Sequence, residues 1–266
     1  HVLCRAIDDD MAAIVENYFR GMGIEIALGE KAQRVTEKGV VAGGKDFDCD
    51  IVVVSAGISP NTSLAQSAGA ENGPRGLKVN EYLQTNLPHV FAVGDLIESP
   101  NLVNGAMLGA GLANSAYIQG TIAGQNALGA KKKYAGTAIT FVTVLGGLEV
   151  AATGFNRSLA QKHGINVVEG RARGKNKYDW YPGAQELTVK VVADAATGKI
   201  IGCQAVGKDA YARINVVSTA IRAGLTLGQL LDVELAYCPP LSEAYDILMV
   251  ATELAKRKMG RNANGA

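Results

Sequence analysis

The spacing of apolar positions predicts an amphipathic helix near the start of the chain. Asp8 to Asp10 precede this helix, and we expect their carboxylates to cap it and to suit its positive end. Gly21 and Gly23 then end it. The apolar positions recur at the spacing of one helical face: Met11, Ile14, Val15, Tyr18 and Phe19.

Two continuous apolar runs predict strands covered on both faces, as in a parallel sheet. They are Ile51–Val54, followed by Ser55-Ala56-Gly57, and Val90–Val93, followed by Gly94-Asp95. A later helix, predicted from Leu112 to Leu128, carries a stripe of small residues that allows close approach to a sheet or a ligand. The other elements predicted here are a strand at 24–27, a hairpin or meander over 33–48, a helix at 63–67 and a strand at 76–79.

The pattern changes after Lys131–Lys133, and we place a domain boundary near residue 135. Ala138–Gly154 predicts strand, turn and strand, and Ala195–Gly198 predicts the tightest hairpin turn of an antiparallel sheet. The remaining strands are expected at 165–173, 186–194 and 199–206, with helices around 158–163, 214–221, 227–231 and 244–254. The predicted fold class is therefore α/β, a partial Rossmann-like region, followed by an α+β domain with an antiparallel sheet.

Composition narrows the class of protein. Lys+Arg 26 against Asp+Glu 25 gives a net charge of +1, which provides no long-range field for nucleic acid or an anionic membrane. No apolar run approaches the roughly 18 residues of a membrane span. The four cysteines form no CxxC pair, so we expect no metal site, and a cytoplasmic protein with reduced cysteines. We interpret Cys4, Cys49 and Cys203 as structural.

The segment Val90–Asp95 suggests a ligand site. A buried strand that ends in Gly-Asp places a carboxylate at the carboxyl edge of a sheet, where open α/β folds bind ligands. Asp95 can accept hydrogen bonds from the hydroxyls of a sugar-like chain. The helix from Leu112 would point free N–H groups at the same crevice. The alternative is that Gly94-Asp95 is only a strand-to-loop turn.

In its context this segment, TNLPHVFAVGD (Thr85–Asp95), resembles the second FAD fingerprint of the pyridine nucleotide-disulfide oxidoreductase superfamily. The resemblance implies that Thr85 begins the motif, that Gly94 lies at the FAD and that Asp95 meets its ribityl hydroxyls. In IVVVSAGISPNTSLA, it places Ala56 and Gly57 near the nicotinamide nucleotide, NAD(P)H.

Three further resemblances follow in the family's order. LANSAYIQGTIAGQNALG resembles the flavin-facing helix, which implies that Leu112, Ala113 and Ser115 contact the isoalloxazine edge. YDWYPGAQELTVKVVAD and GKIIGCQAVG resemble the dimerisation domain, and LAYCPPLSEAYD its terminal interface motif. The implied domains are a remnant of the NAD(P)-binding domain at 1–57, the C-terminal part of the FAD-binding domain at 58–134, and the dimerisation domain at 135–266.

The family's two GxGxxG motifs and its redox cysteine have no counterpart in these 266 residues. We therefore expect this chain to be a fragment that by itself binds FAD weakly or not at all and is inactive.

The C-terminal motif resembles the branch of NADH oxidases and coenzyme A-disulfide or polysulfide reductases. In that branch the tyrosine matching Tyr237 reaches the partner's flavin, which implies a homodimer in which Tyr237 hydrogen-bonds to a thiolate or donates a proton. The alternative is a packed interface tyrosine. The branch often has an aromatic residue where this chain has Leu241. We interpret Cys238 as unreactive, with a second redox thiol as the alternative.

A basic run lies farther upstream, at Arg171, Arg173, Lys175 and Lys177. We interpret it as a solvated hairpin edge, with a site for coenzyme A as the alternative.

The expected function is an oxidoreductase that passes electrons from NAD(P)H through FAD to a small-molecule disulfide, a polysulfide or oxygen, with no nucleic-acid or membrane partner. One alternative is a non-catalytic dimerisation fragment without a cofactor. Another is a reductase of a protein partner such as rubredoxin. A flavin absorption band in the purified protein separates the enzyme from the non-catalytic module.

Overall fold

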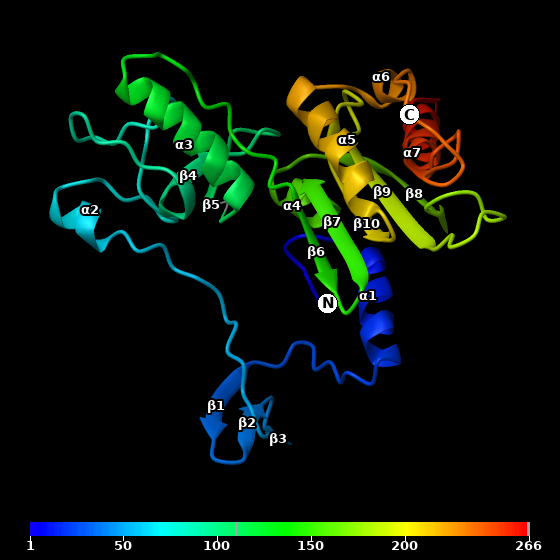
Figure 1. Ribbon diagram of the computed structural model, residues 1–266, viewed down its shortest axis with the longest axis horizontal. Helices are drawn as coiled ribbons and strands as arrows, with labels where there is room; N and C mark the ends of the chain where they lie inside the picture. The colour runs from blue at the N-terminus through cyan, green and yellow to red at the C-terminus, as the bar shows by residue number, and fades with distance from the viewer. Residues whose placement is uncertain (110, 265–266) are drawn as a thin grey trace.

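The computed structural model describes residues 1–109 and 111–264. Its largest unit is a five-stranded sheet that is antiparallel throughout, in the order β6-β7-β10-β9-β8 (Figure 1). The strands are β6 (Phe141–Leu145), β7 (Leu148–Gly154), β8 (Val167–Lys175), β9 (Glu186–Asp194) and β10 (Ile200–Gly207). The antiparallel sheet predicted for the second half of the chain is thus confirmed.

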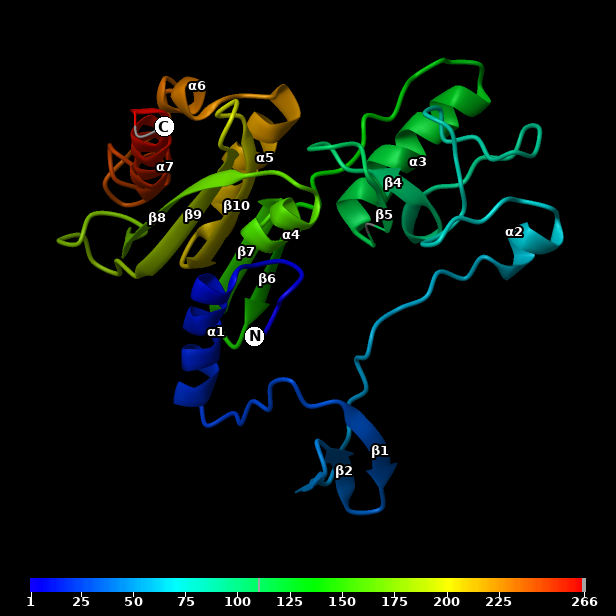
Figure 2. The ribbon, with the colours of Figure 1, turned by 180° about the vertical axis from the view of Figure 1, so that it is seen from behind.

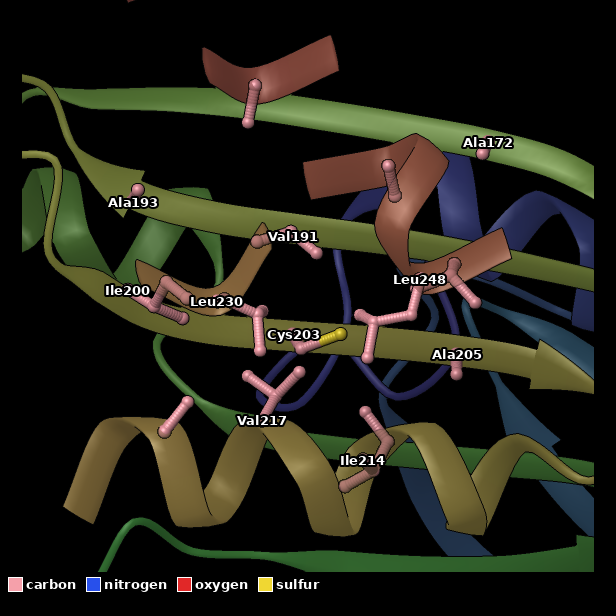
Figure 3. Close-up of a cluster of buried hydrophobic side chains, with 14 of the residues drawn as sticks. Ala172, Val191, Ala193, Ile200, Cys203, Ala205, Ile214, Val217, Leu230 and Leu248 are labelled. Carbon is pink, nitrogen blue, oxygen red and sulfur yellow. The ribbon is translucent and has the colours of Figure 1, made fainter. Parts of the chain in front are cut away.

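One face of this sheet is covered by α5 (Ala210–Ala223) and α7 (Ile247–Asn264), with the short α6 (Leu227–Leu231) beside them. Figure 3 shows Ile214 and Val217 of α5 and Leu248 of α7 meeting at the strand that carries Cys203. The apolar residues of β9 on this face alternate with period 2, as the pleat requires. They are Leu187, Val189, Val191 and Ala193, all fully buried.

The opposite face is covered by α1 (Asp9–Gly21) and α4 (Arg157–Lys162), which lie in front of the sheet when it is seen from behind (Figure 2). Ile7, Met11 and Val15 pack there against Val150 and Val206. The predicted capping of α1 needs a correction. Asp8 is the N-cap residue, but its side chain makes no cap hydrogen bond because its carboxylate is bound by Lys190 and Gln204 of the sheet.

After α1 the chain forms a separate antiparallel meander of β1 (Ala32–Thr36), β2 (Gly39–Ala42) and β3 (Lys45–Asp48), which confirms the predicted meander (Figure 1). The strands predicted at 24–27 and at Ile51–Val54 do not form. Ile51, Val53 and Val54 are 77–86% exposed. A parallel strand gains its hydrogen bonds and its cover from neighbouring elements, and in the part of the chain that the structure describes none pairs with this segment.

The middle of the chain packs a small core around α3 (Ala113–Ala127), the helix predicted from its small-residue stripe. It also contains α2 (Ser63–Ser67), the 3₁₀ turn η1 (Gly94–Leu96), and the two short strands β4 (Glu98–Pro100) and β5 (Met107–Gly109). The strands predicted at 76–79 and Val90–Val93 are wrong, because Leu77 and Phe91 make only isolated bridges. Ala92 is nevertheless buried beside Leu83, to whose carbonyl its N–H donates.

A buried ion pair links Arg213 of α5 to Asp246, the residue directly before α7. The Arg213 Nη2 and Nε atoms lie 2.6 and 3.1 Å from Asp246 Oδ2, and Nη2 also donates to the Asn176 carbonyl at 2.8 Å. Asp246 Oδ1 in turn accepts from the Leu248 N–H at 2.9 Å, at the start of α7. The pair therefore joins α5, α7 and the loop after β8.

Among the described residues, no helix has the length and apolarity to cross a membrane.

Replacing Arg213 by methionine leaves the Asp246 carboxylate buried without its charge partner. We expect Arg213→Met to lower the free energy of unfolding by about 3–5 kcal/mol, measured by urea denaturation. Arg257→Met is the matched control, because Arg257 is 66% exposed in its pair with Glu253. The control should change the free energy of unfolding by roughly 0–1 kcal/mol. Equal effects of the two substitutions would contradict this role of the buried pair.

Candidate functional site

The turn that carries Asp95 is held against α3 by one buried side chain. Gly94 has a φ of +75°, a backbone conformation that favours glycine. Its N–H donates to Gln119 Oε1 at 2.7 Å, and the turn leaves Asp95 exposed. Gly94 also lies against α3, because a Cβ added to it would be 3.5 Å from the Ala116 Cβ. The structure thus brings Asp95 to the N-terminal half of α3, as predicted, although through a 3₁₀ turn and not at the end of a strand.

Gln119 was not among the residues singled out in the sequence. It is 1% exposed, and its amide nitrogen donates to Ser99 Oγ at 3.0 Å and to Tyr134 Oη at 3.1 Å. The side chain therefore uses both ends of its amide to join η1, β4 and the segment after α3. No local signal identifies it, because a glutamine in a helical stripe of small residues is equally compatible with an exposed position.

Thr85 closes the loop that leads into this turn. Its hydroxyl donates to the Val90 carbonyl at 3.1 Å and accepts from the Leu87 N–H at 3.1 Å. The Thr85 N–H donates to the same Val90 carbonyl at 2.9 Å. The side chain of Thr85 therefore fixes the loop.

The residues predicted at the flavin edge occupy different positions at the start of α3. Leu112 is half-buried and Ala113 is exposed, and both line a pocket of about 310 Å³ that β6 and α5 complete. Ser115 is buried, and its hydroxyl lies 3.2 Å from the Thr137 Oγ1 atom. Of the three, Leu112 and Ala113 are open to a ligand, whereas Ser115 serves the packing of α3. The first N–H groups of a helix have no backbone partner within it, and in α3 the Ser115 N–H donates instead to the Asn114 side-chain oxygen at 2.9 Å.

Ala56 and Gly57 lie in an exposed segment without regular structure, and Gly57 has a φ of +114°. The next residue returns to the start of α3, because Ile58 Cδ1 is 3.6 Å from the position that a Cβ would take at Gly111. The structure thus brings this segment near α3.

Tyr237 belongs to the segment between α6 and α7, and these two helices lie at the opposite end of the molecule from α3 in both ribbon views (Figures 1 and 2). It is 47% exposed, and its ring meets the Tyr178 ring edge to face, with centroids 6.0 Å apart. Tyr178 in turn stacks on Trp180 at 5.4 Å. The hydrogen bond with Tyr178, followed by desolvation, raises the pKa of Tyr237. The hydroxyl therefore stays protonated over a wider pH range than that of a free tyrosine.

The four cysteines all lie in described residues and are not paired with one another. Cys203 is buried, and burial raises the pKa of its thiol, which keeps it unreactive. Cys4 and Cys49 are exposed, so the structural interpretation of these two is wrong. The basic run of β8 is partly neutralised by carboxylates, since Arg173 and Lys175 pair with Glu186 at 3.1 and 3.2 Å. This pairing favours the solvated hairpin edge.

Replacing Gln119 by leucine tests its hold on the Asp95 turn. The Gly94 N–H and the Ser99 and Tyr134 hydroxyls would lose their partners, and we expect a loss of about 1–3 kcal/mol in the free energy of unfolding. Amide exchange at Gly94–Leu96 should also accelerate. Gln125→Leu is the matched control, because Gln125 is exposed on the same helix. Unchanged exchange at the turn in Gln119→Leu would show that Gln119 does not hold it.

Replacing Tyr178 by phenylalanine tests its influence on Tyr237. Without the Tyr178 hydroxyl, the pKa of Tyr237 should fall, so tyrosinate absorbance should develop at a lower pH. The double variant Tyr178→Phe/Tyr237→Phe identifies the signal of Tyr237 by difference. Tyr117→Phe serves as the control, because Tyr117 is 80% exposed on α3. A titration of Tyr237 that is identical with and without Tyr178 would contradict this assignment.

Comparison with known proteins gives two matches to one family. Residues 1–110 match the pyridine nucleotide-disulphide oxidoreductases, and residues 140–248 match the dimerisation domain of the same family. The NADH oxidase of Methanocaldococcus jannaschii is 34% identical over 97% of this chain and 58% of its own length. The CoA-dependent NAD(P)H sulfur oxidoreductase of Pyrococcus furiosus is 31% identical over 96% of this chain and 59% of its own length.

A solved structure of the NAD-dependent persulfide reductase from A. fulgidus superposes with a TM-score of 0.93 at 31% identity. The superposition covers 99% of this chain and 50% of the persulfide reductase chain. The chain therefore spans half to three-fifths of the length of these relatives. The two family matches cover both halves of the chain in the expected order, and the chain belongs to the pyridine nucleotide-disulphide oxidoreductases.

Proposed function

We propose that this chain works within a flavoprotein oxidoreductase that passes electrons from NAD(P)H through FAD to a small-molecule disulfide, a polysulfide or oxygen. The observation that carries the proposal is the exposed Asp95 carboxylate, which Gln119 holds beside the first turns of α3. The relatives support it, since they include an NADH oxidase, a CoA-dependent sulfur oxidoreductase and a persulfide reductase. Bound FAD supplies the electron carrier between the nicotinamide and the acceptor.

The chemistry of the residues at this turn fits the ribityl chain and the pyrimidine edge of FAD. A carboxylate accepts hydrogen bonds from hydroxyl groups, which are the polar groups of a ribityl chain. The N-terminal end of a helix such as α3 carries the positive end of the helix dipole, which stabilises negative charge on a ligand. Leu112 and Ala113 are open to such a ligand. Ser115 does not fit a direct contact, because its hydroxyl is buried against Thr137.

We assign the NAD(P)H side to the segment around Ala56 and Gly57. Its backbone is exposed, and Ile58 brings it to Gly111 at the start of α3. A nicotinamide bound along this segment would lie on the same side of the molecule as the proposed flavin contact. With this assignment we propose three domains: a remnant of the NAD(P)-binding domain at 1–57, the C-terminal part of the FAD-binding domain at 58–134, and the dimerisation domain at 135–266.

We propose that two copies of the chain form a homodimer through the surface around Tyr237. Residues 140–248 match a dimerisation domain. Trp180, Leu241 and Tyr245 of this surface are 69, 67 and 52% exposed, an apolar cluster of the kind that marks an interface. Because the α6–α7 segment that carries Tyr237 and the helix α3 that holds the Asp95 turn lie at opposite ends of one chain, Tyr237 would act at the flavin of a partner. Its protonated hydroxyl would then donate a hydrogen bond or a proton to a thiolate. We also propose that the protein acts in the cytoplasm.

Flavin binding tests the proposal directly. The protein, purified as its gene encodes it, should show a flavin absorption band, and Asp95→Ala should weaken FAD binding about 10–100-fold because hydrogen bonds to a charged group are lost. Asp50→Ala is the control, since Asp50 is an exposed aspartate that follows β3. Affinity is measured by titration of FAD fluorescence. A colourless dimer that takes up no FAD would instead support a non-catalytic assembly module.

A further inference from the structure

The side chain of Lys190 is buried between the five-stranded sheet and α1. It is 1% exposed, although it stands in the middle of β9, and it points to the face that α1 covers. Its Nζ lies 2.9 Å from each of three carboxylate oxygens: Asp8 Oδ2, Asp10 Oδ1 and Glu169 Oε1. Two of these carboxylates come from the start of α1 and one from β8. An ammonium group has three donors, so the three carboxylates match its hydrogen-bonding capacity.

The surrounding groups complete a balanced cluster. Arg157 pairs with Glu169, and Arg171 pairs with Asp10 at 3.6 Å. Three cations therefore face three carboxylates. Gln204 of β10 binds Asp8 in both directions, since its Oε1 accepts from the Asp8 N–H at 2.8 Å and its Nε2 donates to Asp8 Oδ2 at 2.7 Å. The cluster thus connects α1 to β8, β9 and β10.

Hydrogen bonds and opposite charges favour the charged forms of Lys190 and Asp8. Burial by itself would lower the pKa of Lys190, but the hydrogen bonds with Glu169, Asp8 and Asp10 outweigh it and hold the pKa above its ordinary value. Burial would raise the pKa of Asp8, but Gln204 and Lys190 outweigh it and keep this pKa below its ordinary value. Because the central pair is buried, added salt screens it only slightly.

The other contacts between α1 and the sheet are mainly apolar or lie at the far end of the helix. Ile7, Met11 and Val15 pack on the sheet beside the cluster, and the Tyr18 hydroxyl donates to the Gly146 carbonyl at 2.6 Å. Beyond the helix, the connection to β1 is almost wholly exposed. Apolar packing tolerates sliding, whereas a lysine bound by three carboxylates defines one position of α1 on the sheet.

We propose that the Lys190 cluster anchors α1 to the sheet, so that residues 1–21 and the five-stranded sheet move as one body. Residues 1–21 fall in the match to the oxidoreductase part of the family, whereas the sheet falls in the match to the dimerisation domain. The anchor therefore joins the two matched parts of the chain outside the proposed flavin site. It requires no cofactor, so it stands or falls independently of the proposed function.

A nicked protein tests the anchor. A specific protease site inserted between Gly29 and Glu30, both exposed, allows the connection after α1 to be cut in the folded protein. We expect residues 1–29 to co-elute with the remainder in size-exclusion chromatography, and Lys190→Met to weaken this retention at least 10-fold. Lys175→Met is the matched control, because Lys175 is also a strand lysine with carboxylate partners but lies on β8, paired with Asp179 and Glu186. Full retention in Lys190→Met would overturn the proposal, because apolar packing would then suffice.

Hydrogen exchange on the uncut protein separates loss of the anchor from loss of the fold. In Lys190→Met, the amides of Met11–Phe19 should exchange at least 10-fold faster, while those of β9 and β10 keep their protection. Equal acceleration in α1 and in the strands would overturn the proposal in favour of a general role in stability. Asp8→Asn provides a milder variant that keeps the size of the side chain, and it should accelerate exchange in α1 by a smaller factor. No acceleration in either variant would also overturn the proposal.

Discussion

The structure depends on the burial of β9 and β10 on both faces. All eight residues of β10 are buried, as are seven of the nine in β9. A strand with no exposed face can carry only side chains that find a partner, and this constraint decides what packs around it. On one face the partners are the apolar residues of α5 and α7. On the other they are α1 and α4, which must also satisfy Lys190 and Gln204.

The same requirement for partners organises the candidate flavin site at a smaller scale. A single buried amide, that of Gln119, determines where Asp95 stands relative to α3. The carboxylate proposed to act remains exposed, whereas the Gln119 amide that holds its turn is buried. Likewise the ring of Tyr178 packs edge to face against Tyr237 and orients it. In both cases the residue proposed to act is held by a neighbour that is not expected to touch the reacting groups.

Sequence reasoning predicted best those elements whose stability is local. The hairpin at 195–198 forms as expected, and Asp194 Oδ1 accepts from the Ala196 and Thr197 N–H groups to close it. α3 forms within one residue of each predicted bound. The predicted strands at Ile51–Val54 and Val90–Val93 failed because their apolar runs describe what a parallel sheet would bury, and such burial depends on elements far away in the sequence.

The sequence by itself determined the family and the antiparallel character of the second half, because local motifs and the periodicity of apolar positions carry this information. Only the tertiary structure decided that Lys190 is buried, that Asp8 and Asp10 bind it so that Asp8 makes no side-chain cap, and that Ser115 faces Thr137. A lysine in an antiparallel strand or an aspartate before a helix carries no local sign of such partners. Their pairing follows from contacts between residues about 180 positions apart, as in the Lys190–Asp10 hydrogen bond. The Lys190 ammonium group can be buried at low cost only when all three carboxylates are in place.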